Sequence, residues 1–225
     1  MSTLWSFNGG YVDTAGFLTL HGLFTAHVTG NFVTFGAAMA HGTPGVAKLL
    51  ALPVFFFVIV LIRTFANRLR SLDWRILESV VVLMILLLSS AAAFAIAWGP
   101  FSTGDRPAAL TTGMALVAAM AIQNAAHRIH LPKTPPSTLM TGTSTQIMID
   151  IADLVTGRLT PDARAVILAR LRMMSASVAS FALGCGMAAL LFIVLGMKVF
   201  LLPPVIAAVS LLAVVRSAKE SGAPS

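Results

Sequence analysis

Charge is scarce in this chain, and negative charge is scarcer still. Only 10% of the residues are charged, and eight acidic residues stand against fifteen basic ones. Soluble globular domains carry about a quarter charged residues, so this composition argues against that class. The single cysteine, Cys185, excludes an intramolecular disulfide.

The chain also has no Walker loop, no Gly-rich dinucleotide turn, no His-Glu-x-x-His string and no nucleophile elbow. We therefore predict that it is not an enzyme and needs no cofactor, with an intramembrane enzyme as the alternative. His127 and His130 are isolated from other ligand types, so no metal site is expected.

Apolar residues dominate instead, at 57% of the chain with a mean hydropathy of +0.90. A membrane-spanning helix needs about 20 apolar residues to cross roughly 30 Å of hydrocarbon. Six segments meet this requirement, namely residues 10–40, 47–66, 76–98, 108–126, 173–196 and 199–215. The predicted fold is thus an all-α integral membrane domain, with no soluble domain attached. The beginning of the chain lacks the pattern of a cleaved signal peptide, so the first span is expected to be retained.

The net charge of +7 does not indicate a nucleic-acid partner, because the basic residues gather at span ends. If the loop after the second span is cytoplasmic, every lysine and arginine except Lys48, Arg106 and Lys198 falls on the cytoplasmic side. This distribution follows the positive-inside rule. It predicts a multi-pass protein in contact with the lipid bilayer, with both termini in the cytoplasm.

A polar pattern occurs twice within these apolar segments. Asp13 precedes the string Thr29-Gly30-Asn31, and Asn124 precedes Thr141-Gly142-Thr143 at nearly the same spacing. The pattern divides the chain into repeats of about 9–98 and 107–216, each with three spans. An odd number of spans forces the second repeat to be inverted relative to the first, a plan common in small-solute transporters.

The helices are expected to break or re-enter at the Thr-Gly steps. A straight helix over residues 10–40 would be about 46 Å long, which exceeds the hydrocarbon thickness. A break at 27–31 removes this excess, since Thr, Gly and Asn are weak helix formers. In the second repeat, residues 138–155 are interpreted as a re-entrant or obliquely buried helix. The polar tail 217–225 is expected to be disordered.

Asp13 is the most informative candidate site residue. A carboxylate among apolar neighbours is costly unless it is paired, wetted or protonated. One interpretation is a cation or proton site, with Asn124 as its counterpart and Gln123 in support. The other is that Asp13 caps the first helix near the membrane interface.

The Thr-Gly steps supply the remaining candidates, and each has two interpretations. Thr29, Asn31, Thr141 and Thr143 could line a cavity at broken helices, or the small residues could allow close helix crossing. His27 could relay protons near neutral pH or pack as a hydrogen-bonded side chain. Asp150 could face the cavity or lie elsewhere on its helix, and Asp153 is expected near Arg158.

A stripe of small residues on one predicted span is interpreted as structural. Ala176, Ser180, Gly184 and Ala188 recur every four residues. Such a stripe gives a smooth surface for a neighbouring helix, either within the molecule or across an oligomer.

The strings Gly10-Tyr11-Val12-Asp13 and Phe24-Thr25-Ala26-His27-Val28-Thr29-Gly30-Asn31, with Gln123-Asn124-Ala125-Ala126 and Thr141-Gly142, resemble the YoaK-like family. This is a family of small six-span bacterial membrane proteins filed as a domain of unknown function. The resemblance extends over essentially the whole chain. It implies a bacterial inner-membrane location and little about mechanism. The second copy has Thr143 where the first has Asn31, so a strictly two-fold site is not implied.

These patterns together predict a transporter of a small solute or ion, with proton coupling as an option. Its site would lie between the two Thr-Gly breaks. The alternatives are a passive channel and a non-transporting membrane scaffold, and fold analogy cannot choose among them. A homo-oligomer is a further expectation, since dimers are the commonest default.

Overall fold

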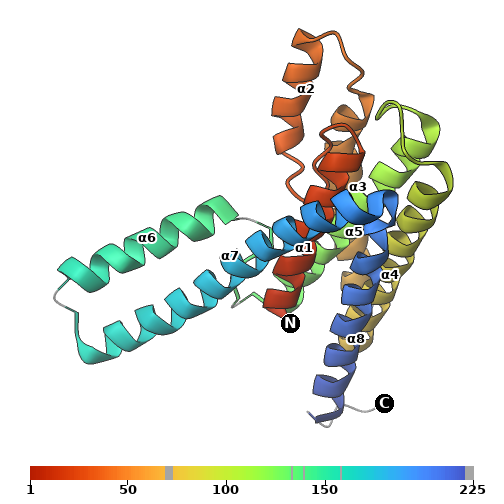
Figure 1. Ribbon diagram of the computed structural model, residues 1–225. Coiled ribbons are helices and arrows are strands. Elements are labelled where there is room, and N and C mark those ends of the chain that lie inside the picture. The colour runs from red at the N-terminus through yellow and green to blue at the C-terminus, as the bar shows by residue number, and fades with distance from the viewer. Residues whose placement is uncertain (69–72, 133, 139, 158, 221–225) are drawn as a thin grey trace.

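The computed structural model describes residues 1–68, 73–132, 134–138, 140–157 and 159–220, with the side chains of 73–75 and 217–220 outside the description. Over these residues it consists of helices joined by loops, with no strand (Figure 1). Its α-helices and one 3₁₀ segment are α1 (Ser2–Thr19), α2 (Gly30–Ala40), α3 (Val46–Arg68), α4 (Asp73–Trp98), α5 (Pro107–His130), α6 (Met140–Thr156), α7 (Pro161–Leu195), η2 (Gly196–Leu201) and α8 (Leu202–Glu220). The prediction of an all-α fold is confirmed.

Among the described residues, four helical stretches are long and apolar enough to cross a membrane: Val46–Arg68, Ile76–Trp98, Pro107–His130 and Pro161–Arg216. They mark the chain as a membrane protein. The fourth stretch contains both predicted spans 173–196 and 199–215. These separate at Gly196, whose positive φ of 55° ends α7 and begins the η2 turn. The predicted opening span, 10–40, is divided between α1 and α2.

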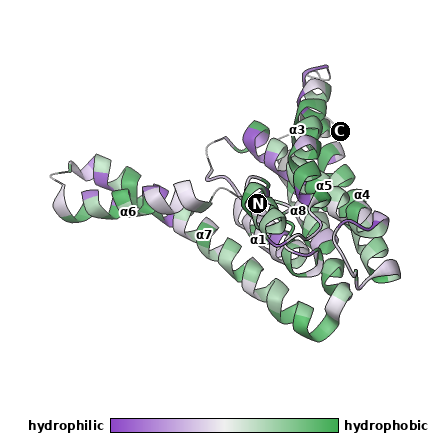
Figure 2. Cartoon of the chain, turned by 90° about the horizontal axis from the view of Figure 1, so that it is seen from above, coloured by the Kyte–Doolittle hydropathy of each residue, from purple (hydrophilic) through white to green (hydrophobic). Residues whose placement is uncertain are grey.

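Helices α1 and α5 form the interior of the bundle. Tyr11, Val12 and Ala15 of α1 are fully enclosed, and so are Val117 and Met120 of α5. Helix α7 packs along α1, while α3 and α4 pack against α5 (Figure 1). Helix α3 lies at the periphery and exposes Phe57 and Val60. Many large apolar side chains are exposed, and hydrophobic residues run along most of the helices (Figure 2), as a protein surrounded by lipid requires.

The crossing of α1 and α7 depends on two glycines. A Cβ atom on Gly10 would collide with the Phe181 carbonyl, and one on Gly184 would collide with the Phe7 carbonyl. Small residues let helix backbones approach closely in membranes. The small-residue stripe predicted on this span therefore serves an intramolecular contact at Gly184 and Ala188, both of which are buried, although Ala176 is exposed.

Helix α6 returns along the first part of α7, and the two form an arm that extends away from the bundle (Figures 1 and 2). Asp150 of α6 and Arg170 of α7 hold the arm together through contacts of 2.9 and 2.6 Å between carboxylate and guanidinium. The expected proximity of Asp153 to Arg158 lies outside the described residues. The predicted disordered tail is helical as far as Glu220, and residues 221–225 also lie outside the description.

Candidate functional site

After α1 the chain folds back along the helix it has just left. The reversal is made at His21 and Gly22, both with positive φ. The backbone amides of Thr25 and Ala26 then each donate to Asp13 Oδ1 over 2.7 Å. Asp13 lies well inside α1, which continues to Thr19. A carboxylate that accepts backbone amides is a strong anchor because the hydrogen bonds are charge-assisted. Asp13 therefore fixes the position of the loop 20–29.

The other oxygen of Asp13 contacts His27. The distance from His27 Nδ1 to Asp13 Oδ2 is 2.7 Å, with Asp13 buried and His27 one-third exposed. The His27 ring also meets Phe181 of α7 edge to face, with 5.3 Å between ring centres. The two predicted site residues are thus brought together. Their contact orients the imidazole.

The side chain of Asn31 is hydrogen-bonded to the backbone of the first loop and does not face a cavity. Its side-chain Oδ1 accepts from the Phe24 amide at 2.9 Å, and its Nδ2 donates to the Phe24 carbonyl at 2.7 Å. The side chain is buried, at 2% exposure. Both polar atoms of Asn31 are therefore used to join the start of α2 to the preceding loop.

A second loop folds back after α5, the helix that carries Asn124. Thr138 donates its hydroxyl to Asn124 Oδ1 over 2.6 Å, and Asn124 Nδ2 donates to the Met120 carbonyl at 2.9 Å. Nearer the turn, His127 Nε2 and Thr134 Oγ1 are 2.8 Å apart. The second loop is therefore held by side-chain groups of α5, much as the first loop is held by Asp13.

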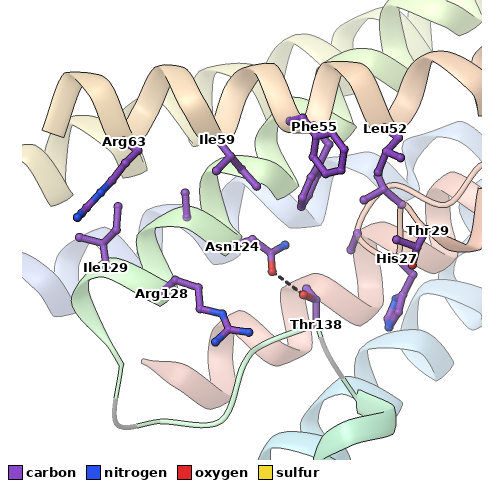
Figure 3. Close-up of a pocket in the computed structure, with 14 residues that line it drawn as sticks. His27, Thr29, Leu52, Phe55, Ile59, Arg63, Asn124, Arg128, Ile129 and Thr138 are labelled. Carbon is purple, nitrogen blue, oxygen red and sulfur yellow. Dashed lines mark hydrogen bonds between the residues drawn. The ribbon is translucent and has the colours of Figure 1, made fainter. Parts of the chain in front are cut away.

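The two loops meet at a cavity of about 660 Å³ between α3 and α5. Figure 3 shows the Asn124–Thr138 bond near its centre, with His27 and Thr29 on one side of it and, on the other side, Arg128 near the centre and Arg63 farther out. A volume of this size suits a small molecule. The residues that line it are Ala26, His27, Val28, Thr29, Leu52, Phe55, Phe56, Ile59, Arg63, Asn124, Ala125, Arg128, Ile129 and Thr138.

A second cavity, of about 550 Å³, lies on the other side of the first loop. Asp13, Phe17 and Cys185 are among its lining residues, and it shares His27 and Thr29 with the first cavity. These two residues therefore belong to a thin partition between two cavities. We call residues 25–30, which contain both, the partition segment.

Two positive charges line the first cavity without a compensating acid. Arg63 comes from α3 and Arg128 from α5, and both side chains are exposed. Within the described part of the chain, neither guanidinium forms an ion pair with a carboxylate. The carboxylate of Asp13 is turned toward the first loop and His27. The electrostatic character of this end of the cavity is therefore positive.

Besides Asn31, four predicted site residues line neither of the two cavities. Gln123 joins α5 to α1 by accepting from Asn8 at 2.8 Å and donating to the Trp5 carbonyl at 2.9 Å. Asp150 is bound to Arg170 within the arm. The remaining two are on α6, where Thr143 is buried and Thr141 lies on an open face.

Sequence reasoning assigned Arg63 and Arg128 to the cytoplasmic span ends, and it did not single out Phe55 or Thr138 as site residues. One signal was available: Arg63 precedes the end of α3 by five residues, so it lies within an apolar helix rather than after it. The side of the helix from which Arg63 projects could be known only from the tertiary structure.

No group of three or more His, Cys, Asp or Glu side chains suited to a metal occurs in the residues searched, which are the described ones.

Residues 1–213 match the family described as "Protein of unknown function (DUF1275)". The chain belongs to this family, for which YoaK-like is a synonym, so the resemblance noted in the sequence is confirmed. Neither a curated protein nor a solved structure matches the chain. The family description assigns no activity, and function has to be argued from the geometry of the site.

Proposed function

With this family membership as the premise, we propose that the protein is a transporter of a small solute and not an enzyme. The solute would occupy the cavity between α3, α5 and the two folded-back loops. The observation that carries the proposal is that His27 and Thr29 line two separate cavities. A shift of the partition segment would connect these cavities, which is the movement that a carrier needs.

The order of the elements is consistent with a duplicated architecture, which would support this function. The order of helix, folded-back loop, short helix and two longer helices occurs in α1–α4 and again in α5–α8. If α1 corresponds to α5 and α3 to α7, the packing of α7 on α1 and of α3 on α5 is the same contact in two copies. We propose that the two copies form an inverted repeat, with the segments 20–40 and 131–156 entering the membrane from opposite faces. Solute sites of inverted-repeat transporters lie between such discontinuous elements near the midplane.

The Asp13–His27 pair suits proton coupling. His27 is held by Asp13 through Nδ1, and its ring reaches both cavities. Histidine changes charge near neutral pH. A proton gained or lost by the Asp13–His27 pair would alter the charge at the partition segment. In this proposal, a protonation change accompanies the movement that opens one cavity and closes the other.

Thiol labelling tests the partition without knowledge of the solute. In a Cys185→Ser background, a Thr29→Cys variant is expected to react with a membrane-impermeant methanethiosulfonate reagent in both right-side-out and inside-out vesicles. The matched control is Val60→Cys, because Val60 is on the exposed apolar face of α3 and is expected to face lipid. It should react from neither side.

The result separates the three candidate functions. Labelling of Thr29→Cys from only one side would contradict alternating access and favour a scaffold. Labelling from both sides together with a steady conductance in planar bilayers would identify a channel. Labelling from both sides without conductance is the outcome that the carrier predicts.

A further inference from the structure

The end of the first cavity marked by Arg63 and Arg128 has the chemistry of an anion site. Positive side chains within membrane proteins are costly, and they usually pair or face water or a pathway. Here two guanidinium groups from different helices line one cavity, and in the described residues they have no carboxylate partner. Arginine presents a planar fork of donors that matches the oxygens of a carboxylate, sulfonate or phosphate. An incoming anion would supply the missing partner.

The wall of the same cavity is largely apolar. Leu52, Phe55 and Ile59 of α3 face it, as does Ile129 of α5 (Figure 3). A fully hydrated inorganic ion would gain nothing from such a wall. A molecule with an apolar body would bury that body there, with a gain of about 25 cal/mol for each Å² removed from water. The cavity therefore combines a charged end with an apolar wall.

We infer that the solute is an organic anion with an apolar body, which lies against Phe55 and Ile59 while its charged head is attracted to the part of the cavity lined by Arg63 and Arg128. This inference rests on the proposed function and specifies its substrate class. It also replaces the expectation of a cation site at Asp13. The Oδ1 atom of that carboxylate already accepts from the amides of Thr25 and Ala26, and its other oxygen contacts His27.

The headgroup of an anionic lipid shares this chemistry, and the experiment has to distinguish the two sources. Arg63 and Arg128 lie toward the ends of their helices, where headgroups of the bilayer are expected. We commit to the soluble anion because the lining extends inward to Asn124, Thr138 and His27, which offer polar contacts beyond the charged end.

Binding to the purified protein provides the first arm of the test. Benzenesulfonate is permanently charged, and benzenesulfonamide is its neutral counterpart of similar shape. In neutral detergent, benzenesulfonate should raise the melting temperature in a concentration-dependent way, because a ligand that binds the folded state stabilises it. Benzenesulfonamide should bind at least about tenfold more weakly, since hydrogen bonds to charged groups contribute about 1.5–3 kcal/mol. Equal binding of the two probes, or no binding of either, would overturn the inference.

Variants locate the binding to this cavity. R63Q and R128Q should each weaken benzenesulfonate binding about tenfold. The matched control is R68Q, which removes an exposed arginine from the same helix that does not line the cavity. Unchanged binding in the double variant R63Q/R128Q would overturn the inference. The comparison of probes on the unaltered protein remains decisive if a variant fails to fold.

Experiments in vesicles distinguish a lipid headgroup from a soluble anion as the ligand. They also distinguish failure of this inference from failure of the proposed transport function. In phosphatidylcholine liposomes, the protein should accelerate benzenesulfonate uptake, and added phosphatidylglycerol should leave binding within about twofold. Loss of binding in phosphatidylglycerol would overturn the soluble anion in favour of a lipid site. Binding without uptake would support the anion site and contradict the transport function. Saturable uptake of cationic or neutral solutes without anion binding would contradict the anion site and support the transport function.

Discussion

The two folded-back loops, 20–29 after α1 and 131–139 after α5, take similar courses but are held by different chemistry. In the first loop, a buried carboxylate accepts backbone amides from Thr25 and Ala26. In the second, the amide oxygen of Asn124 accepts only the Thr138 hydroxyl. Both loops contribute to the wall of one cavity. Among the described residues of the second loop, no charged group takes the role that Asp13 has in the first.

This difference indicates which part of the wall is the more firmly held. Charge-assisted hydrogen bonds are roughly twice as strong as neutral ones, and bonds to backbone amides fix the course of the chain itself. A bond to a threonine hydroxyl fixes mainly the side chain. We therefore expect the backbone of the first loop to be well defined beside Asp13 and the second loop to open at a lower free-energy cost.

The largest effect is expected from Asp13→Ala. The change leaves the buried amides of Thr25 and Ala26 without an acceptor and removes the partner of His27. A buried backbone amide left without an acceptor costs about 1–3 kcal/mol, and here two amides lose theirs. The melting temperature in detergent should fall strongly, and amide hydrogen exchange over 24–27 should accelerate. Asp13→Asn keeps an acceptor oxygen, so its melting temperature should lie between those of Asp13→Ala and the unaltered protein. Slow exchange over 24–27 in Asp13→Ala would contradict the anchoring role.

Asn31→Ala should have the next largest effect. It removes the two hydrogen bonds to the Phe24 backbone, one accepted and one donated. Unsatisfied buried backbone groups cost about 1–3 kcal/mol. We expect a smaller fall in melting temperature, with faster exchange at Phe24 and the amides of Thr25 and Ala26 still protected by Asp13. Exchange that accelerates equally over the whole segment 20–29 would mean that the loop opens as one unit.

Asn124→Ala tests the side chain of α5 that contacts Thr138 of the second loop. It removes the acceptor of the Thr138 hydroxyl, which is one neutral hydrogen bond between the loop and α5. Such a bond contributes about 1 kcal/mol. The expected fall in melting temperature is well below that of Asp13→Ala, with exchange over 24–27 unchanged. Equal destabilisation by the two variants would contradict the difference between the loops.

Thr138→Val should have the smallest effect. The substitution conserves shape and removes only the hydroxyl that donates to Asn124. Asn124 borders the cavity and can recover a partner from water, so the expected cost is about 0.5–1 kcal/mol. Differential scanning fluorimetry on matched preparations can measure it. A loss larger than that of Asn124→Ala would indicate that Thr138 has a packing role beyond its hydroxyl.

Local patterns predicted the helical class, the approximate spans and the importance of Asp13. Each depends on residues that are near one another in the chain, such as the apolar run 46–68 or the weak helix formers Thr29, Gly30 and Asn31. The pairing of Asp13 with His27 was not predicted, although both residues were. The pairing required the chain to turn back at His21, and nothing in the polar pattern specifies the direction of that turn.

The composition and periodicity of this chain were sufficient to establish a helical membrane protein with polar interruptions in its apolar segments, because hydrocarbon imposes the same requirement on every spanning residue. Tertiary packing decided which polar groups share a cavity. It directed Asn31, Gln123 and Asp150 into structural bonds, and it placed Arg63 and Arg128 on a common wall. The physical reason is that contacts between distant segments depend on the angle and rotation of each helix, which the spacing of residues along one helix does not encode.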